Sequence, residues 1–313
     1  MAIPHVESAT GAPSAARVEP VGARGLRALA EAMRPRQWTK NVFVFAGVTF
    51  AGRLREPQSL LHACLAFVAF CGASSAVYLL NDLADRETDA HHPQKRLRAI
   101  ASGRLPAPIA LGAALLFGAG GLALSLRLAT GAGALVAADL LLSLAYSAGL
   151  KRVFLLDTLI VAIGFVLRAA TGAAAVDAGI SPWLLCCTFL LAFFLVLGKR
   201  RQELRLLGAE ADRHRSSLSR YTAPLVDGWL NALSGAAIVA YALYTQSPRT
   251  VENFKTTALV YTVPFVVYAL FRYQALVVGE ELGGDPTTAV LRDRGIMLAV
   301  LGWATAVAAI IYR

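Results

Sequence analysis

The chain has 313 residues, of which 57% are hydrophobic and only 16% are charged, and its formal net charge is +10. Soluble domains usually have about 45–50% apolar and about 25% charged residues, so the composition excludes an ordinary soluble domain and predicts an all-α, polytopic membrane protein. Its four cysteines lie in apolar runs without a C-x-x-C pair, as expected of small apolar filler residues in reduced form.

The N-terminal region precedes the apolar stretches. Residues 1–23 have no apolar core of the kind a signal peptide needs, and their Ala, Pro, Ser and Gly content predicts a disordered cytoplasmic tail. Residues 24–38 place Leu26 and Met33 on one face with arginines nearby, which predicts an amphipathic helix on an anionic membrane surface. This helix and the spans after it are expected to form one membrane domain, 24–313.

Nine apolar stretches come next, and a membrane crossing needs about 20 such residues, so we predict a bundle of nine transmembrane helices. The first stretch is short for a complete crossing. The expected spans are 41–55, 59–81, 107–126, 130–149, 154–175, 182–198, 224–244, 256–271 and 296–312.

The basic residues are distributed unevenly between the two sides of these spans. One side, with the N-terminus, carries 23 of the 30 Lys and Arg residues, the other carries six, and Arg168 lies inside a span. The positive-inside rule therefore predicts a cytoplasmic N-terminus and an outer C-terminus. Basic residues confined to one membrane face and mixed with acidic ones argue against a nucleic-acid partner and favour phosphorylated small molecules or lipid headgroups.

The second expected span runs directly into the acidic segment NDLADRETDA, residues 81–90. On a continuous helix Asp82, Asp85 and Asp89 would fall within about 60° of one another, with Asn81 on the flank. Such carboxylates repel one another unless a cation lies among them, and all-oxygen ligands suit Mg²⁺, which also bridges to phosphates. We therefore predict that these four residues bind Mg²⁺; the alternative is a solvated helix end.

A basic segment, HPQKRLRAIASGRLP, follows at residues 92–106. Its Lys95 and Arg98 would bring positive charge to the carboxylates, and metal plus cations beside a membrane suit a diphosphate substrate. The positive-inside tendency alone explains why the loop is basic, but not its pairing with the acidic segment.

These two segments resemble a known family. N-D-x-x-D-x-x-x-D at 81–89 and H-P-x-K-R-x-R-x-I-A-S-G at 92–103 are similar to the UbiA-type prenyltransferase superfamily, which implies a nine-helix bundle whose first aspartate motif holds magnesium on a diphosphate. Further segments resemble its decaprenyl-phosphate phosphoribosyltransferase branch. They are RPRQWTKN at 34–41, YSAGLKR at 146–152, LRAATG at 167–172, GKRRQEL at 198–204 and LRDR at 291–294.

The resemblance to this branch implies a reaction. The donor would be phosphoribosyl pyrophosphate and the acceptor a polyprenyl (decaprenyl) phosphate, giving decaprenylphosphoryl-5-phosphoribose and diphosphate for arabinose-containing cell-envelope polymers. The enzyme would lie in the bacterial inner membrane with its active site on the cytoplasmic side. Whether copies assemble into a homo-oligomer is left open.

The loop after the sixth span separates this reading from an aromatic prenyltransferase. Aromatic members of the superfamily carry a second aspartate-rich motif there, whereas GKRRQELRLLGAEADRHRSSLSRYT at 198–222 contains several cations and no D-x-x-x-D. The loop therefore predicts direct anion binding, with Lys199 and Arg200 as candidates. The alternative is a helix end with ordinary positive-inside charge.

Two charged residues lie within the fifth expected span. Asp157 and Arg168 are about 20° apart in angle but some 16 Å apart along a helix axis, too far to pair directly. They would either line one polar cavity at two depths, or join a structural network with partners such as Asp139 and Asp227.

The hypothesis is a magnesium-dependent phosphoribosyl transfer. The expected catalytic residues are Asp82, Asp85, Lys40 and Tyr146. The expected substrate-binding residues are Lys40, Lys95, Arg98, Lys151, Arg168, Lys199 and Arg200. Two rival functions remain: an aromatic prenyltransferase with an acceptor such as 4-hydroxybenzoate, and a transporter that uses Asp157 and Arg168 as an ion relay.

Overall fold

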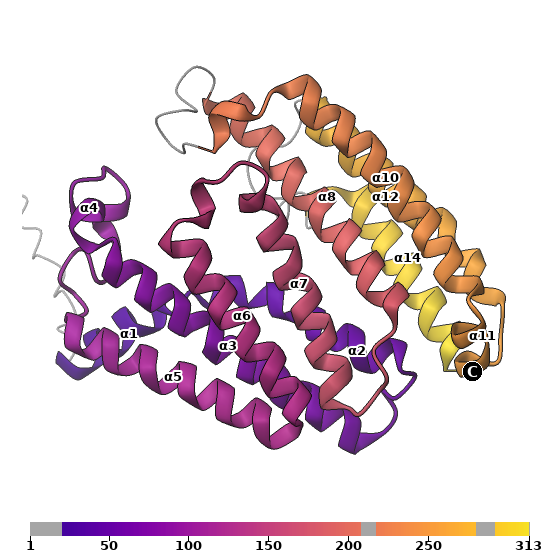
Figure 1. Cartoon of the computed structure of the whole chain (residues 1–313), viewed down its shortest axis with the longest axis horizontal. Coiled ribbons are helices and arrows are strands. Elements are labelled where there is room, and N and C mark those ends of the chain that lie inside the picture. Colours follow the sequence, from indigo (N-terminus) through magenta and orange to yellow (C-terminus); the bar gives the residue numbers. More distant parts are fainter. Residues whose placement is uncertain (1–20, 208–216, 280–291, 313) are drawn as a thin grey trace, which may run out of the picture.

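The protein is described by a computed structural model over residues 21–207, 217–279 and 292–312, and these residues form helices and no strand. Residues 1–20 of the expected tail, 1–23, lie outside the described residues. The helices form two groups along the chain (Figure 1). The first group contains α1 (Val21–Ala32), η1 (Pro35–Val44), α2 (Phe45–Phe50), α3 (Pro57–Ala84), α4 (Arg86–Ala90), η2 (Lys95–Leu97), α5 (Ala107–Leu128), α6 (Thr130–Ala148), η3 (Leu150–Arg152) and α7 (Leu156–Ala175).

The second group begins with α8, which packs against both α7 and α10 and so joins the two groups. Its outer helices α12 and α14 pack against each other behind α10. The group contains α8 (Pro182–Leu207), η5 (Leu218–Arg220), α10 (Ala223–Gln246), α11 (Pro248–Phe254), η6 (Ala258–Thr262), α12 (Val263–Val278) and α14 (Arg294–Ile311).

Eight helices in the described part of the chain are long and apolar enough to cross a membrane. They correspond to the second through ninth expected spans, so the protein is an all-helical, multi-pass membrane protein. The eight are α3, α5, α6, α7, α8, α10, the η6–α12 pair and α14.

The first expected span, 41–55, is built differently from the others. The 3₁₀ helix η1 leads into the six-residue α2, and both pack against α7. A Cβ on Gly172 would overlap the Val44 carbonyl oxygen, and one on Gly47 would overlap the Ala173 backbone nitrogen. The two glycines therefore allow η1 and α2 to lie directly on the α7 backbone, which is close packing of the kind small residues permit in membranes.

The amphipathic segment expected over 24–38 divides into two elements. α1 ends at Ala32, and η1 starts at Pro35 after Arg34. Proline has no N–H to donate and disfavours helical geometry in the residue before it, so a single helix cannot continue through this position. Arg34 takes up left-handed backbone angles, φ 54° and ψ 61°, and these redirect the chain between the two elements.

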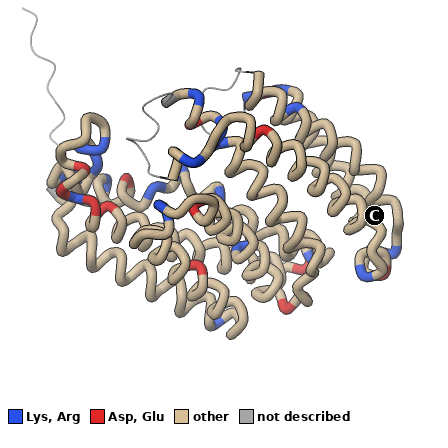
Figure 2. The backbone as a smooth tube through the Cα atoms, turned by 45° about the horizontal axis from the view of Figure 1, so that its top comes forward, with Lys and Arg blue, Asp and Glu red and all other residues tan. Residues whose placement is uncertain are grey.

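Charged residues concentrate at one end of the bundle (Figure 2). This end, called here the carboxylate end, contains the C-terminus of α3, α4, η2, η3 and the C-terminal part of α8. The opposite end contains the α2–α3 connection, the α7–α8 connection and α11.

Candidate active site

The acidic segment lies at the carboxylate end, but it is not one continuous helix, so that expectation was wrong. α3 ends at Ala84, Asp85 caps it, and α4 starts at Arg86. Asp82 and Asp89 are buried, at 4% and 3% exposure, while Asp85 is half-buried. Seven residues of straight helix would separate Asp82 from Asp89 by about 10 Å along the axis. The bend at Asp85 brings these two carboxylates together.

Arg98 is the cation that the two buried carboxylates share. Its Nη1 donates to Asp82 Oδ1 at 3.1 Å and to Asp89 Oδ2 at 2.6 Å, and Lys95 Nζ lies 3.9 Å from Asp89 Oδ1. The predicted pairing of the basic segment with the acidic one is therefore present in the structure. A buried carboxylate needs such a partner because an uncompensated charge in a low-dielectric interior is very costly.

Arg34, which is not among the predicted site residues, also binds Asp82. Its Nη2 donates to the same Asp82 Oδ1 at 2.6 Å, and its guanidinium lies 5.1 Å from the ring centre of Tyr78, one turn before Asp82 on α3. Left-handed backbone angles at a residue other than glycine are uncommon and concentrate at functional sites. The RPRQWTKN motif pointed to this segment, but the placement of the side chain depends on the turn at Arg34.

α1 holds this turn in place. Its apolar side packs on α3, α5 and the 99–105 loop. On its exposed side Glu31 forms a bidentate ion pair with Arg104, with N···O distances of 2.7 and 2.8 Å. The hydrogen bonds from Arg104 lower the pKa of Glu31 below its usual value. The basic loop after η2 is thereby attached to the helix that precedes Arg34.

The predicted magnesium ligands are oxygen donors, as the ion prefers, and two of the four, Asp82 and Asp89, lie against one cationic group. Within the described ranges, no group of three or more His, Cys, Asp or Glu side chains is arranged to hold a metal ion. The oxygen donors fit Mg²⁺. In this structure the positive charge between Asp82 and Asp89 is that of Arg98. The metal-binding role of Asn81, Asp82, Asp85 and Asp89 stays a prediction.

A second polar network lies where α7 begins and α8 ends. Asp157, which is fully buried, lies 3.1 Å from Arg200 Nη2 and accepts hydrogen bonds from Tyr221 at 2.7 Å and Ser217 at 3.1 Å. Arg200 is itself 4% exposed and also pairs with Glu203. Burial, together with the adjacent Asp157, raises the pKa of Tyr221 to about 12, so the phenol stays protonated and donates. This network fastens the basic end of α8 to α7.

Arg168 belongs to a third network, deep in the first group of helices. Its Nε donates to Asn41 Oδ1 at 2.9 Å, and its Nη1 donates to Asp139 Oδ1 at 3.0 Å and to the Gly164 carbonyl at 2.6 Å. The guanidinium also lies 5.1 Å from the ring centre of Phe70. The ion pair expected between Arg168 and an acidic partner is thus made with Asp139. The distance argument against an Asp157–Arg168 pair agrees with this arrangement, because each residue has another partner.

The other predicted site residues differ in their surroundings. Lys40 on η1, Tyr146 near the end of α6 and Lys151 in η3 are half-buried, whereas Lys199 and Lys95 are exposed. Tyr146 interacts electrostatically with Arg200. Asp227, the other suggested acidic partner, pairs with Arg201 at 2.8 Å. The substrate-binding and catalytic roles of the predicted residues stay predictions.

Comparison with known proteins identifies relatives over most of the chain. The profile of the UbiA prenyltransferase family matches residues 41–291. The chain is 34% identical to decaprenyl-phosphate phosphoribosyltransferase of Mycolicibacterium smegmatis, covering 91% of this chain and 92% of that one. It is 33% identical to the protein of the same name from Corynebacterium glutamicum, covering 90% and 86%. A UbiA homolog from Archaeoglobus fulgidus bound to GPP and Mg²⁺ has a similar fold, with a TM-score of 0.70 at 17% identity over 91% of this chain and 100% of that one.

Proposed function

The chain belongs to the UbiA prenyltransferase family, and we propose on that premise that it transfers 5-phosphoribose from phosphoribosyl pyrophosphate to a polyprenyl phosphate such as decaprenyl phosphate. The products are the lipid-linked phosphoribose and diphosphate. The relatives called decaprenyl-phosphate phosphoribosyltransferase, which match about nine-tenths of the chain, support this assignment.

The structural observation behind the proposal is the arrangement around Asp82. One carboxylate oxygen accepts hydrogen bonds from two guanidinium groups, Arg34 and Arg98, and Arg98 also bridges to Asp89. Two carboxylates and two guanidinium groups therefore lie in contact at the C-terminus of α3, at the carboxylate end. Such an arrangement suits a substrate that carries both a diphosphate and a metal ion, because the acids bind the metal and the arginines bind the phosphate oxygens.

Asn81, Asp82, Asp85 and Asp89 are the residues that would hold Mg²⁺. When bound, the metal neutralises the negative charge that develops on the departing diphosphate. In this proposal Arg34 and Arg98 donate hydrogen bonds to oxygens of the departing diphosphate while the bond to the anomeric carbon lengthens. Of the three aspartates among the predicted ligands, Asp85 has no hydrogen bond to an arginine among the described contacts, which leaves its carboxylate available to a ligand.

The acceptor is an anion, and the cations at the other side of the carboxylate end are suited to it. Lys199 is exposed next to the buried Arg200, and Lys151 lies in the η3 turn beside the start of α7. A phosphate monoester is already a negatively charged nucleophile, so attack on the anomeric carbon does not require a general base. The half-buried Tyr146 can donate a hydrogen bond to the ribose or to a phosphate.

The carboxylate end faces the cytoplasm of a bacterial cell in this proposal, since the 23-to-six distribution of basic residues follows the positive-inside rule. The N-terminus is then cytoplasmic and the C-terminus lies on the outer side. Soluble phosphoribosyl pyrophosphate and magnesium are available on the cytoplasmic side.

A product assay tests the reaction. Purified protein in detergent, supplied with labelled phosphoribosyl pyrophosphate, decaprenyl phosphate and MgCl₂, should form a labelled lipid, and an excess of EDTA should stop its formation. A parallel reaction with a prenyl diphosphate and 4-hydroxybenzoate tests the aromatic rival. Prenylated 4-hydroxybenzoate without any phosphoribosyl lipid would refute the proposal.

Asp85→Asn tests the metal site with little risk to the fold, because this half-buried side chain is not one of the carboxylates held by Arg34 or Arg98. Loss of a metal-binding carboxylate should lower kcat by about 100-fold or more, comparable to the loss of one transition-state donor. Glu87→Gln is the matched control, since Glu87 is exposed on α4 two residues away and should keep normal turnover. Equal activities of the two variants would contradict the assignment.

A further inference from the structure

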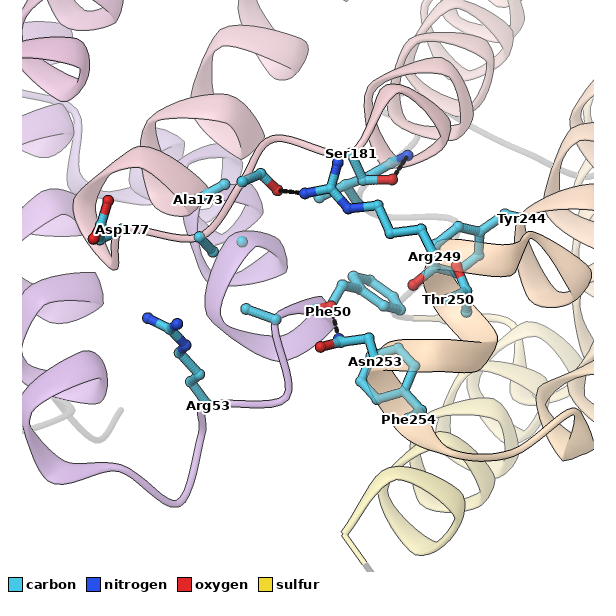
Figure 3. Close-up of a pocket in the computed structure, with 15 residues that line it drawn as sticks. Phe50, Arg53, Ala173, Asp177, Ser181, Tyr244, Arg249, Thr250, Asn253 and Phe254 are labelled. Atoms are coloured by element: carbon cyan, nitrogen blue, oxygen red, sulfur yellow. Dashed lines mark hydrogen bonds between the residues drawn. The ribbon is translucent and has the colours of Figure 1, made fainter.

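The opposite end of the bundle contains a cavity of about 180 Å³ (Figure 3). Arg53, in the α2–α3 connection, and Arg249, at the start of α11, both line it. α2, the α7–α8 connection, α10 and α11 supply its walls, so the cavity lies where the two groups of helices meet. Ligand sites often form between such groups.

Two guanidinium groups contact the α7–α8 connection from different sides of this cavity (Figure 3). Arg53 Nη1 donates to the Val176 carbonyl at 2.7 Å. Arg249 donates to the Gly179 carbonyl at 2.7 Å and to the Ile180 carbonyl at 3.3 Å. Neither arginine forms an ion pair with a carboxylate of the described residues. Arg53 is half-buried and Arg249 is exposed, so both charges stand at the cavity without an ion-pair partner in the described part of the chain and make its lining attractive to an anion.

Two residues of the α7–α8 connection, Gly179 and Asp177, shape the backbone beside these arginines. A Cβ at Gly179 would overlap Arg249 Nη2, so any larger residue at this position would displace the guanidinium from its present place. Asp177 lines the cavity with φ 49°, a left-handed conformation that is uncommon for a residue other than glycine. Its carboxylate reduces the net charge of the lining from two positive charges to one, so the cavity favours a single negative charge.

Three aromatic residues contribute to the remaining walls. Phe50, Phe254 and Tyr244 line the cavity, and the Phe50 ring packs against Tyr244 at 5.7 Å and against Trp303 at 6.2 Å between centroids. Tyr and Trp, whose rings carry a polar OH or NH group, gather at the level of lipid headgroups, as Tyr244 and Trp303 would here. The anion is therefore expected at the membrane interface, and the cavity has room for a headgroup phosphate rather than for a nucleotide.

We propose that this cavity binds the phosphate of an anionic phospholipid in the leaflet opposite the carboxylate end. Arginine is suited to phosphate because its planar fork donates two parallel hydrogen bonds. Arg53 and Arg249 hold the phosphate, Asn253 can donate from its side-chain amide, and the aromatic walls contact the glycerol and the first acyl carbons. The bound lipid would join the two groups of helices at this end. This proposal is independent of the transfer reaction.

Lipid binding to the purified full-length protein tests it, measured by native mass spectrometry and by thermal shift with dioctanoyl phosphatidylglycerol, dioctanoyl phosphatidylcholine and inorganic phosphate as probes. Phosphatidylglycerol should bind most tightly. Arg53→Gln and Arg249→Gln should each weaken it at least tenfold, whereas Arg127→Gln, an exposed arginine at the end of α5 away from the cavity, should not.

Asp177→Asn gives a second test that does not remove either arginine. Asparagine tolerates left-handed angles, so the variant should fold, and loss of the negative charge should tighten phosphatidylglycerol binding. Unchanged binding in both arginine variants, or weaker binding in Asp177→Asn, would overturn the site. Inorganic phosphate binding as tightly as phosphatidylglycerol would overturn the lipid as its ligand.

Discussion

Replacing Arg168 by leucine should destabilise the protein because it leaves the Asp139 carboxylate buried, at 3% exposure, without its ion-pair partner. Asn41 and the Gly164 carbonyl lose their hydrogen bonds to the guanidinium as well. Removing one member of a buried pair costs about 3–5 kcal/mol in soluble proteins. Arg168 donates three hydrogen bonds, and hydrogen bonds between membrane helices contribute about 0.6 kcal/mol each on average, which gives a lower value of about 2 kcal/mol.

The expected loss is therefore about 2–5 kcal/mol, which corresponds to a fall in Tm on the order of 10 °C. Fluorescence-detected size-exclusion chromatography after heating in detergent measures this fall. A double variant, Arg168→Leu with Asp139→Leu, removes the unpaired carboxylate and should recover at least half of the lost stability. A single variant that melts within about 2 °C of the wild type, or a double variant no better than the single one, would refute this reasoning.

The double variant also tests the predicted substrate-binding role of Arg168. If the network around Asp139 is only structural, recovery of the fold should restore turnover with an unchanged KM for phosphoribosyl pyrophosphate. A well-folded double variant with a raised KM would instead support direct contact between the guanidinium and the substrate.

Three further changes have defined outcomes. Gly172→Ala should prevent folded protein from accumulating, since its methyl group would overlap the η1 backbone, whereas Gly112→Ala on α5, with no atom within 4 Å, should melt normally. The pKa of Tyr221 is raised to about 12 from a usual 10.0, so stability should fall as pH rises from about 10 to about 12, and Tyr221→Phe should flatten that part of a Tm–pH curve. The pKa of Glu31 is lowered from 4.5, so its contribution should be complete above pH 4.5 and lost on acidification, and Arg104→Gln should remove most of this acid-side dependence, leaving the smaller effect of Arg27.

The sequence by itself determined the membrane class, the positions of eight membrane helices and the family. Apolar stretches of about 20 residues have few structural alternatives in a bilayer, because backbone groups must be satisfied within each helix. The sequence also predicted that the acidic and basic segments within 81–106 pair with each other, because buried charges need partners of opposite sign. Arg98 with Asp82 and Asp89 fulfils that expectation.

Only the tertiary structure decided which charges pair across long distances in the chain. Arg34 reaches Asp82 through a left-handed turn that no hydrophobic pattern reveals. Asp139, one of the two acidic candidates that the sequence suggested, is the partner of Arg168, and Arg200, which the sequence did not suggest for this role, is the partner of Asp157. Helical periodicity fixes the face on which a residue lies, but the packing of neighbouring helices fixes which side chain meets it.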